Sequence, residues 1–194
     1  MALVQVAVEG TTDQVVAHKL CEIAGLEASD TYICGGKPNL DRRLPGYNAA
    51  AAHSAWFVMR DLDTDEACAP SLKQRLLPRP GTHMCFRIVV RSLEAWLMGD
   101  RKGIARYFGV PVTRVPDSPE RIQHPKAAFV DLARRSSRRI IREEIVPRAG
   151  SVVTVGPGYT GHVIEFVGNI WDPRAAACRC PSLKRCMQAL AALH

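Results

Sequence analysis

A short apolar stretch that turns abruptly acidic, residues 55–66, constrains the fold of this chain most. Residues 55–59 are bulky and apolar, which is typical of a buried strand in a parallel sheet. Asp61 and Asp63 follow at the point where that strand is expected to end. Ligands of open α/β sheets bind at this carboxyl edge. The two aspartates are therefore candidate functional residues.

The acidic residues after this strand are close enough in sequence to repel one another. Asp61-Leu62-Asp63-Thr64-Asp65-Glu66 holds four carboxylates in six residues. A cation among them would relieve the repulsion, and Mg²⁺ suits the position because it prefers oxygen ligands. A solvated acidic loop that caps the next helix is the alternative, and the motif by itself leaves both interpretations open.

A second strand-like run places another carboxylate in an equivalent position. Residues 2–8 are rich in β-branched side chains and predict the first strand, which is followed by Glu9-Gly10-Thr11-Thr12-Asp13. Glu9 precedes the turn, so helix capping does not explain it. Asp13 is explained equally well by the positive end of the following helix.

The chain alternates between strands and helices in its first half and is helical in its second. We expect an α/β fold with a four-stranded, largely parallel sheet that is flanked by helices. Residues 1–100 would form this core, and residues 101–194 a helical extension packed on it. The four strands are predicted at 2–8, 31–34, 56–59 and 82–90.

If the strands before Glu9 and Asp61 are neighbours, their carboxylates converge with Asp63 on a space that suits Mg²⁺ or Mn²⁺. With two ions about 4 Å apart, one would activate water and the other would stabilise the leaving oxygen. Candidates for completing a second site are Asp13, Asp65 and Glu94.

Basic residues beside these motifs are candidates for contacts with phosphate. Lys37 follows a Gly-Gly turn, Arg60 precedes the first aspartate and Arg91 precedes Glu94. Lys126 is a further candidate for a catalytic contact, because metal nucleases place cations near the transition state. It is equally an ordinary lysine of a first helical turn. The arginine run from 134 to 142 is usually a solvated helix face.

Composition sets the remaining expectations. The net charge of +7 and the pI near 9.2 suit a polyanionic partner such as nucleic acid. No stretch is apolar and long enough to cross a membrane, and the N-terminus lacks the pattern of a signal peptide, so a cytoplasmic location is expected. Seven cysteines fit a reducing compartment. The cluster Cys178, Cys180 and Cys186 lacks the spacing of a structural zinc site.

A strand ending in Glu-Gly-x-x-Asp, followed later by one ending in Asp-x-Asp, resembles the TOPRIM domain of topoisomerases, primases and nucleases of the overcoming-lysogenization-defect type. Nearly the whole chain resembles a bacterial family of small TOPRIM-like proteins of unknown function. The shared motifs are Val8-Glu9-Gly10-Thr11-Thr12-Asp13, Gly35-Gly36-Lys37, Arg60-Asp61-Leu62-Asp63, Arg91-Ser92-Leu93-Glu94-Ala95-Trp96-Leu97 and His124-Pro125-Lys126.

The resemblance implies that Glu9 is a metal ligand or general base and that Asp61 and Asp63 bind metal, with Glu94 at the family's acidic position. It also implies a role in phage defence with an ATPase partner. The expected function is Mg²⁺-dependent phosphodiester cleavage, as in a nuclease. The alternative is a regulatory module that binds metal or nucleotide without turnover. A phosphohydrolase of the haloacid-dehalogenase type is disfavoured, because Asp65 stands where its motif needs threonine.

Overall fold

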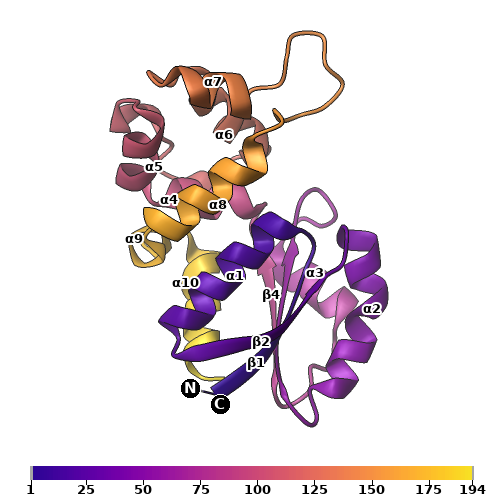
Figure 1. Ribbon diagram of the computed structural model, residues 1–194. Coiled ribbons are helices and arrows are strands. Elements are labelled where there is room, and N and C mark those ends of the chain that lie inside the picture. The colour runs from indigo at the N-terminus through magenta and orange to yellow at the C-terminus, as the bar shows by residue number, and fades with distance from the viewer. Residues whose placement is uncertain (1, 194) are drawn as a thin grey trace. The chain divides into compact units, whose positions relative to one another are not determined.

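The computed structural model describes residues 2–193, which form two compact units (Figure 1). The first unit comprises the chain up to Val90 together with the segment from Ser182 onward, and the second runs from Arg91 to Pro181. The chain therefore divides ten residues before the predicted boundary at residue 100, and its last segment belongs with the first unit.

The first unit is built on a four-stranded sheet in which all strands run parallel, in the order β2-β1-β3-β4. The predicted α/β fold class is thus confirmed. The order makes β1 and β3 direct neighbours, as the convergence of Glu9 and Asp61 requires. The strands are β1 (Ala2–Val8), β2 (Leu26–Ile33), β3 (Ala55–Asp61) and β4 (Met84–Val89).

Helices cover both faces of this sheet. Figure 1 shows α1 and α10 on one side of it and α2 and α3 on the other. Side chains from alternate strand positions, such as Ala7, Val58 and Phe86, pack in one apolar cluster with Leu44 of α2 and Leu72 of α3. These helices are α1 (Thr11–Ile23), α2 (Lys37–Ala50), α3 (Ala69–Leu76) and α10 (Pro181–Ala191).

The two inner strands differ from the edge strand β2 in how deeply they are buried. Residues 56–60 of β3 are all buried, as expected for a strand covered on both faces. By contrast, β2 exposes Glu27, Asp30 and Tyr32. It begins five residues before the predicted start at Thr31, because its polar first half carries no apolar strand pattern.

The second unit is helical throughout, as predicted for this part of the chain. Its core contains large aromatic side chains, among them Phe108 and Phe129, whose rings meet edge to face at 5.0 Å between centroids. The helices are α4 (Leu93–Gly99), α5 (Arg101–Phe108), α6 (Pro125–Arg134), α7 (Arg139–Ile145), α8 (Tyr159–Asn169) and α9 (Pro173–Ala177), with short 3₁₀ turns η1 (Val112–Arg114) and η2 (Pro119–Arg121).

Two glycines of this unit permit close approaches that a side chain would prevent. A Cβ at Gly99 would lie 2.7 Å from Sγ of Cys180 and 2.9 Å from the carbonyl oxygen of Ala176, so α4 and α9 pack directly. Gly109 ends α5 with a φ of +63° and would collide with Oγ of Ser137 if it carried a Cβ. Within residues 2–193, no helix has the length and apolar character needed to span a membrane.

Candidate functional site at the carboxyl edge of the sheet

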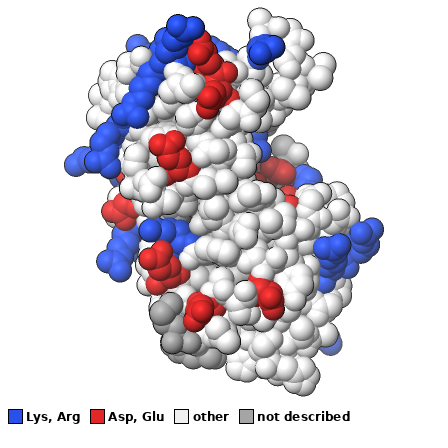
Figure 2. All heavy atoms as spheres, viewed as in Figure 1, with Lys and Arg blue, Asp and Glu red and all other residues white. Residues whose placement is uncertain are grey.

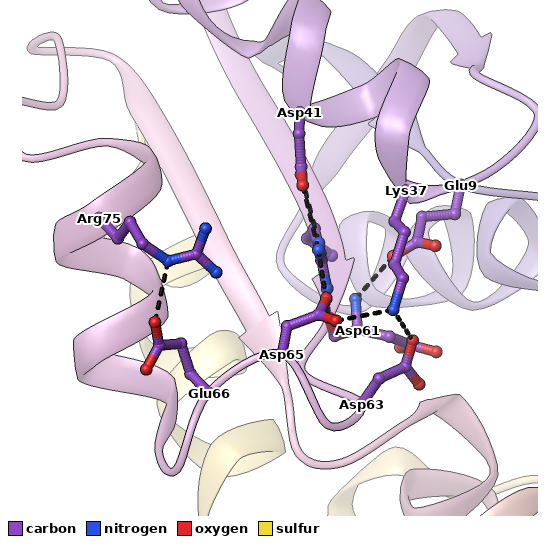
Figure 3. Close-up of polar contacts among 9 residues, drawn as sticks. Glu9, Lys37, Asp41, Asp61, Asp63, Asp65, Glu66 and Arg75 are labelled. Carbon is purple, nitrogen blue, oxygen red and sulfur yellow. Dashed lines mark hydrogen bonds and ion pairs between the residues drawn. The ribbon is translucent and has the colours of Figure 1, made fainter.

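Glu9 and Asp61 meet at the carboxyl edge of the sheet. Glu9 directly follows β1, and Asp61 is the last residue of the neighbouring strand β3. The backbone N–H of Asp61 donates a hydrogen bond of 2.9 Å to Oε1 of Glu9 (Figure 3). The structure therefore brings together these two predicted site residues. Carboxylates are the ligands that a hard cation prefers, and both residues carry one.

A glycine turn holds Lys37 at the same edge. The backbone N–H groups of Gly35 and Gly36 both donate to the carbonyl oxygen of Glu9, at 2.9 and 3.0 Å. The two glycines have φ values of +73° and +110°, which other residues rarely adopt. Helix α2 begins immediately afterwards at Lys37. The turn thus links the end of β1 to the start of α2. Its two N–H groups are both hydrogen-bonded to Glu9.

The Lys37 ammonium lies between two carboxylates of the loop that follows β3, residues 62–66, which we call the acidic loop. Its Nζ is 2.9 Å from Oδ2 of Asp63 and 2.9 Å from Oδ1 of Asp65 (Figure 3). Asp63 has a φ of +48°, a left-handed conformation that aspartate tolerates better than most residues. The cation expected among these acids is therefore supplied, for this pair, by the chain itself.

Arg60 supplies a second positive charge from the buried side of the loop. Its side chain is only 3% exposed, and Nη2 lies 3.0 Å from Asp41 and 2.6 Å from Asp65. Its Nε also donates to Asp41, and Nη1 donates to the backbone carbonyl of Asp61. Arg60 thus ties α2, β3 and the acidic loop together. Its burial favours a positioning role over the phosphate contact that the sequence suggested.

The pKa values of Glu9 and Asp65 are shifted in opposite directions. Burial raises the pKa of Glu9, and the hydrogen bond from Asp61 and the charge of Arg60 offset only part of this effect. Burial also tends to raise the pKa of Asp65, but hydrogen bonds from Lys37 and Arg60 outweigh it and lower that pKa. Unlike Asp65, Glu9 therefore lacks enough nearby positive charge to offset its burial, and a further cation would stabilise its ionised form.

Lys37 responds to the same carboxylates. Burial tends to lower the pKa of its ammonium, but hydrogen bonds to Asp63 and Asp65 outweigh this and raise the pKa above its ordinary value. Lys37 therefore remains charged at neutral pH. It would compete with a metal ion for the oxygens of Asp63.

Asp13, a candidate ligand, is engaged at the start of α1. Its Oδ2 accepts a hydrogen bond of 3.0 Å from the backbone N–H of Gly10, the residue that caps the helix. This matches the capping role that the sequence left open for Asp13.

Three other predicted site residues, Arg91, Glu94 and Lys126, lie in the second unit. Glu94 is 2% exposed, and its carboxylate accepts hydrogen bonds from Ser92, at 2.6 Å, and from the hydroxyl of Tyr159. Nζ of Lys126 is 3.4 Å from the same carboxylate and 5.7 Å from the centre of the Tyr159 ring. Glu94 thus has its partners within its own unit, at the first turns of α4, α6 and α8.

No preassembled metal site is present among the described residues. Within 2–193, no group of three His, Cys, Asp or Glu side chains is arranged to hold a metal ion. The three C-terminal cysteines do not act together: Cys178 is exposed, Cys180 is buried in the second unit, and Cys186 is buried in the first beside Cys85 and Cys21.

Sequence reasoning missed the part played by Asp41 and the pairing of Lys37 with the acidic loop. Asp41 lies in the middle of α2, 19 residues before Arg60, and nothing in its local pattern sets it apart from a surface acid. The Gly-Gly turn did mark Lys37, but it gave no sign that the ammonium would face Asp63.

Comparisons with models of protein families, with curated proteins and with solved structures find no match to this chain.

Proposed function

We propose that this protein cleaves phosphodiester bonds in a reaction that requires Mg²⁺, or Mn²⁺ in its place, with nucleic acid as the substrate. One observation carries the proposal. Glu9, a partly buried carboxylate with a raised pKa, is held against Asp61 where two central parallel strands end. This is the edge at which open α/β sheets bind their ligands.

The residues at this edge fit an ion that takes few ligands from the protein. Glu9 and Asp61 offer carboxylate oxygens, the donor type that Mg²⁺ prefers. Mg²⁺ usually retains several waters and binds substrate phosphate, so two protein carboxylates suffice. Asp63 is a third candidate, and it becomes available when Lys37 moves away. A bound ion would supply Lewis-acid stabilisation of the phosphate charge.

The side chains divide the remaining work. Glu9 either ligates the ion or, where Asp61 and Asp63 hold it, accepts a proton from the attacking water, a role that suits a carboxylate whose pKa is raised. Lys37 gives up its ion pair with Asp63, binds a phosphate group of the substrate instead, and offsets the negative charge of that phosphate. Arg60 holds the acidic loop through the carbonyl of Asp61 and the carboxylate of Asp65, and does not touch the substrate.

A second function is favoured by the ion pairs themselves. Lys37 and Arg60 form ion pairs with Asp41, Asp63 and Asp65, two positive charges against three negative ones, so ion pairs hold this cluster together without metal. Such a site suits a regulatory module that binds a metal or a nucleotide without turnover. An ATPase partner, which the family resemblance implies, stays a prediction under either function.

Calorimetric titration with Mg²⁺ and Mn²⁺ separates these functions when it is combined with a nuclease assay. The wild type and the Asp61→Asn, Asp63→Asn double variant are compared, with and without a non-hydrolysable oligonucleotide. We expect metal binding and cleavage in the wild type and neither in the variant. Metal or nucleotide binding without cleavage of DNA or RNA would favour the regulatory module, and no binding under any condition would refute both.

A further inference from the structure

The surplus positive charge of the chain is concentrated in its second unit. Residues 91–181 contain 15 of the 26 Lys and Arg residues but only 9 of the 19 Asp and Glu residues, a formal net charge of +6. The first unit therefore carries only +1 of the total of +7. A difference in length does not explain this asymmetry, because the two units are similar in length.

Burial sharpens the contrast at the surface of the second unit. Thirteen of its basic side chains are exposed, but only five of its acidic ones, since Glu94 and Asp100 are buried and two others are half-buried. The exposed surface is thus considerably more positive than the net charge indicates. Long-range attraction of polyanions follows from such a surface.

Part of this charge forms a band over α5 and α7. We define the arginine band as Lys102, Arg106, Arg135, Arg138, Arg139 and Arg142, all of which are exposed. Figure 2 shows Lys and Arg side chains running continuously along the upper left of the molecule, over α7 and α5.

Backbone contacts explain why α5 and α7 share this surface. The turn between α6 and α7 is anchored to the end of α5: Ser136 Oγ donates to the carbonyl of Phe108, and the Ser137 N–H donates to that of Gly109 at 3.4 Å. Gly109 makes this approach possible because it has no Cβ.

The stability of α7 does not account for its arginines. Arg138 is the N-cap, Arg139 follows, and the first turn contains no acid, although the positive end of a helix favours acidic residues there. Positive charge at this end of a helix is destabilising. Among the described residues, Arg139 alone in the band has an acidic partner, Glu143 at 2.7 Å, and neither Arg135 nor Arg138 forms a salt bridge there. Arg138, placed at the unfavourable end of α7 without an acidic partner among the described residues, points to a ligand outside the chain.

We propose that the arginine band binds the phosphate backbone of a duplex nucleic acid without reading its sequence. A duplex carries about one negative charge per 1.7 Å of its axis and so matches a continuous band of guanidinium groups. The second unit exposes no large aromatic side chain on which unpaired bases could stack. Ile140 is the single large apolar side chain exposed on α7, which offers little for insertion into a membrane.

This binding requires neither metal nor cleavage by the first unit. The test measures fluorescence anisotropy of a labelled duplex in EDTA, over a series of salt concentrations, with the full chain. The band variant is Arg135→Gln, Arg138→Gln, which breaks no salt bridge. The matched control is Lys184→Gln, Arg185→Gln, which removes two exposed charges from α10 of the first unit.

We expect the band variant to bind on the order of tenfold more weakly than wild type and to reduce the slope of log K against log salt by about 1.8, since each lost phosphate contact accounts for about 0.9. The control should change neither quantity appreciably. Absence of duplex binding, equal losses in both variants, or tighter binding to anionic vesicles than to duplex would each overturn the inference. Metal-free duplex binding with no cleavage upon Mg²⁺ addition would refute the proposed function alone.

Discussion

The N–H of Asp61 donates a 2.9 Å hydrogen bond to the carboxylate of Glu9, and so joins two residues that are 52 positions apart in the chain. The bond stabilises the ionised form of Glu9, but burial disfavours that form more strongly. The backbone of β3 thus holds a carboxylate that is reluctant to ionise at the carboxyl edge of the sheet.

Replacing Glu9 with glutamine should stabilise the fold at neutral pH. The folded pKa of Glu9 is raised above its ordinary value of 4.5, so the folded state prefers the protonated form. Its favourable contribution is complete below that value and is lost as the pH rises through the raised pKa. In thermal unfolding, the melting temperature of Glu9→Gln relative to that of wild type should rise as the pH increases from about 4 to 7. The exposed Glu27→Gln serves as the control, and a pH-independent difference would contradict the raised pKa.

The same substitution should abolish metal-dependent cleavage. If Glu9 accepts the proton of the attacking water, its loss should reduce the rate by about 10²–10⁴-fold, as for other general bases. Single-turnover cleavage with saturating Mg²⁺ measures this effect separately from substrate binding. Retention of full activity would remove Glu9 from the mechanism.

Removing the Lys37 charge should strengthen metal binding. The ammonium and a metal ion compete for the oxygens of Asp63, so Lys37→Gln should bind Mg²⁺ severalfold more tightly in calorimetry. Cleavage should nevertheless fall, because the variant lacks the cation that meets the substrate phosphate. Lys73→Gln on α3 is a control of equal charge. Unchanged affinity in Lys37→Gln would show that the ion does not reach Asp63.

Arg60 should contribute far more to stability than a comparable surface arginine. Arg60→Gln leaves Asp41 and Asp65 without their buried partner, and we expect a loss of about 2 kcal/mol. This is below the 3–5 kcal/mol of a fully buried pair because both carboxylates remain partly solvated. Arg75→Gln breaks the exposed pair with Glu66 and should cost less than about 1 kcal/mol. Urea denaturation compares the two variants, and equal losses would contradict the role assigned to Arg60.

Glu94 should be a structural residue of the second unit. Glu94→Gln replaces a buried carboxylate that accepts hydrogen bonds from Ser92 and Tyr159, and we expect a cost of about 1–3 kcal/mol. Mg²⁺ affinity, measured at a temperature where the variant is folded, should stay unchanged. A loss of affinity without a loss of stability would restore the metal-binding role that the sequence suggested.

Gly109 should be needed for the join between α5 and the turn after α6. Gly109→Ala meets both a φ of +63° and the Ser137 hydroxyl, so about 1–3 kcal/mol should be lost. Gly161→Ala in α8 encounters nothing within 4 Å and should stabilise the helix by about 0.5–1 kcal/mol. Differential scanning calorimetry of both variants tests the contrast.

The parts of the fold that could be predicted are those with a local signature. Apolar runs that end in acid identified β1 and β3, and the short crossovers implied parallel strands. The polar start of β2 escaped because an edge strand is solvated and lacks that signature. Proline usually interrupts a helix, yet α2 continues through Pro45.

The site was predictable only where it depends on strand order. Glu9 and Asp61 meet because parallel strands share an edge. The neutralisation of Asp63 by Lys37 joins residues 26 positions apart through side-chain geometry, which no local pattern encodes. The same holds for the destination of α10: its apolar stripe indicates a helix but not the surface on which it packs.

The packing of α10 on the first unit has a consequence for the synthesis of the chain. In α10, Ser182 Oγ accepts a hydrogen bond from the N–H of Val90, and Cys186 is buried beside Cys85 of β4. The part of the sheet face over β4 that α10 covers therefore remains exposed until the ribosome has translated the whole helical unit. The second unit can fold as it emerges, whereas the first, although its strands are made earlier, is completed only by the last helix. The nascent chain would thus expose apolar side chains of β4 while the second half of the chain is made, the stage at which chaperone binding would be most useful.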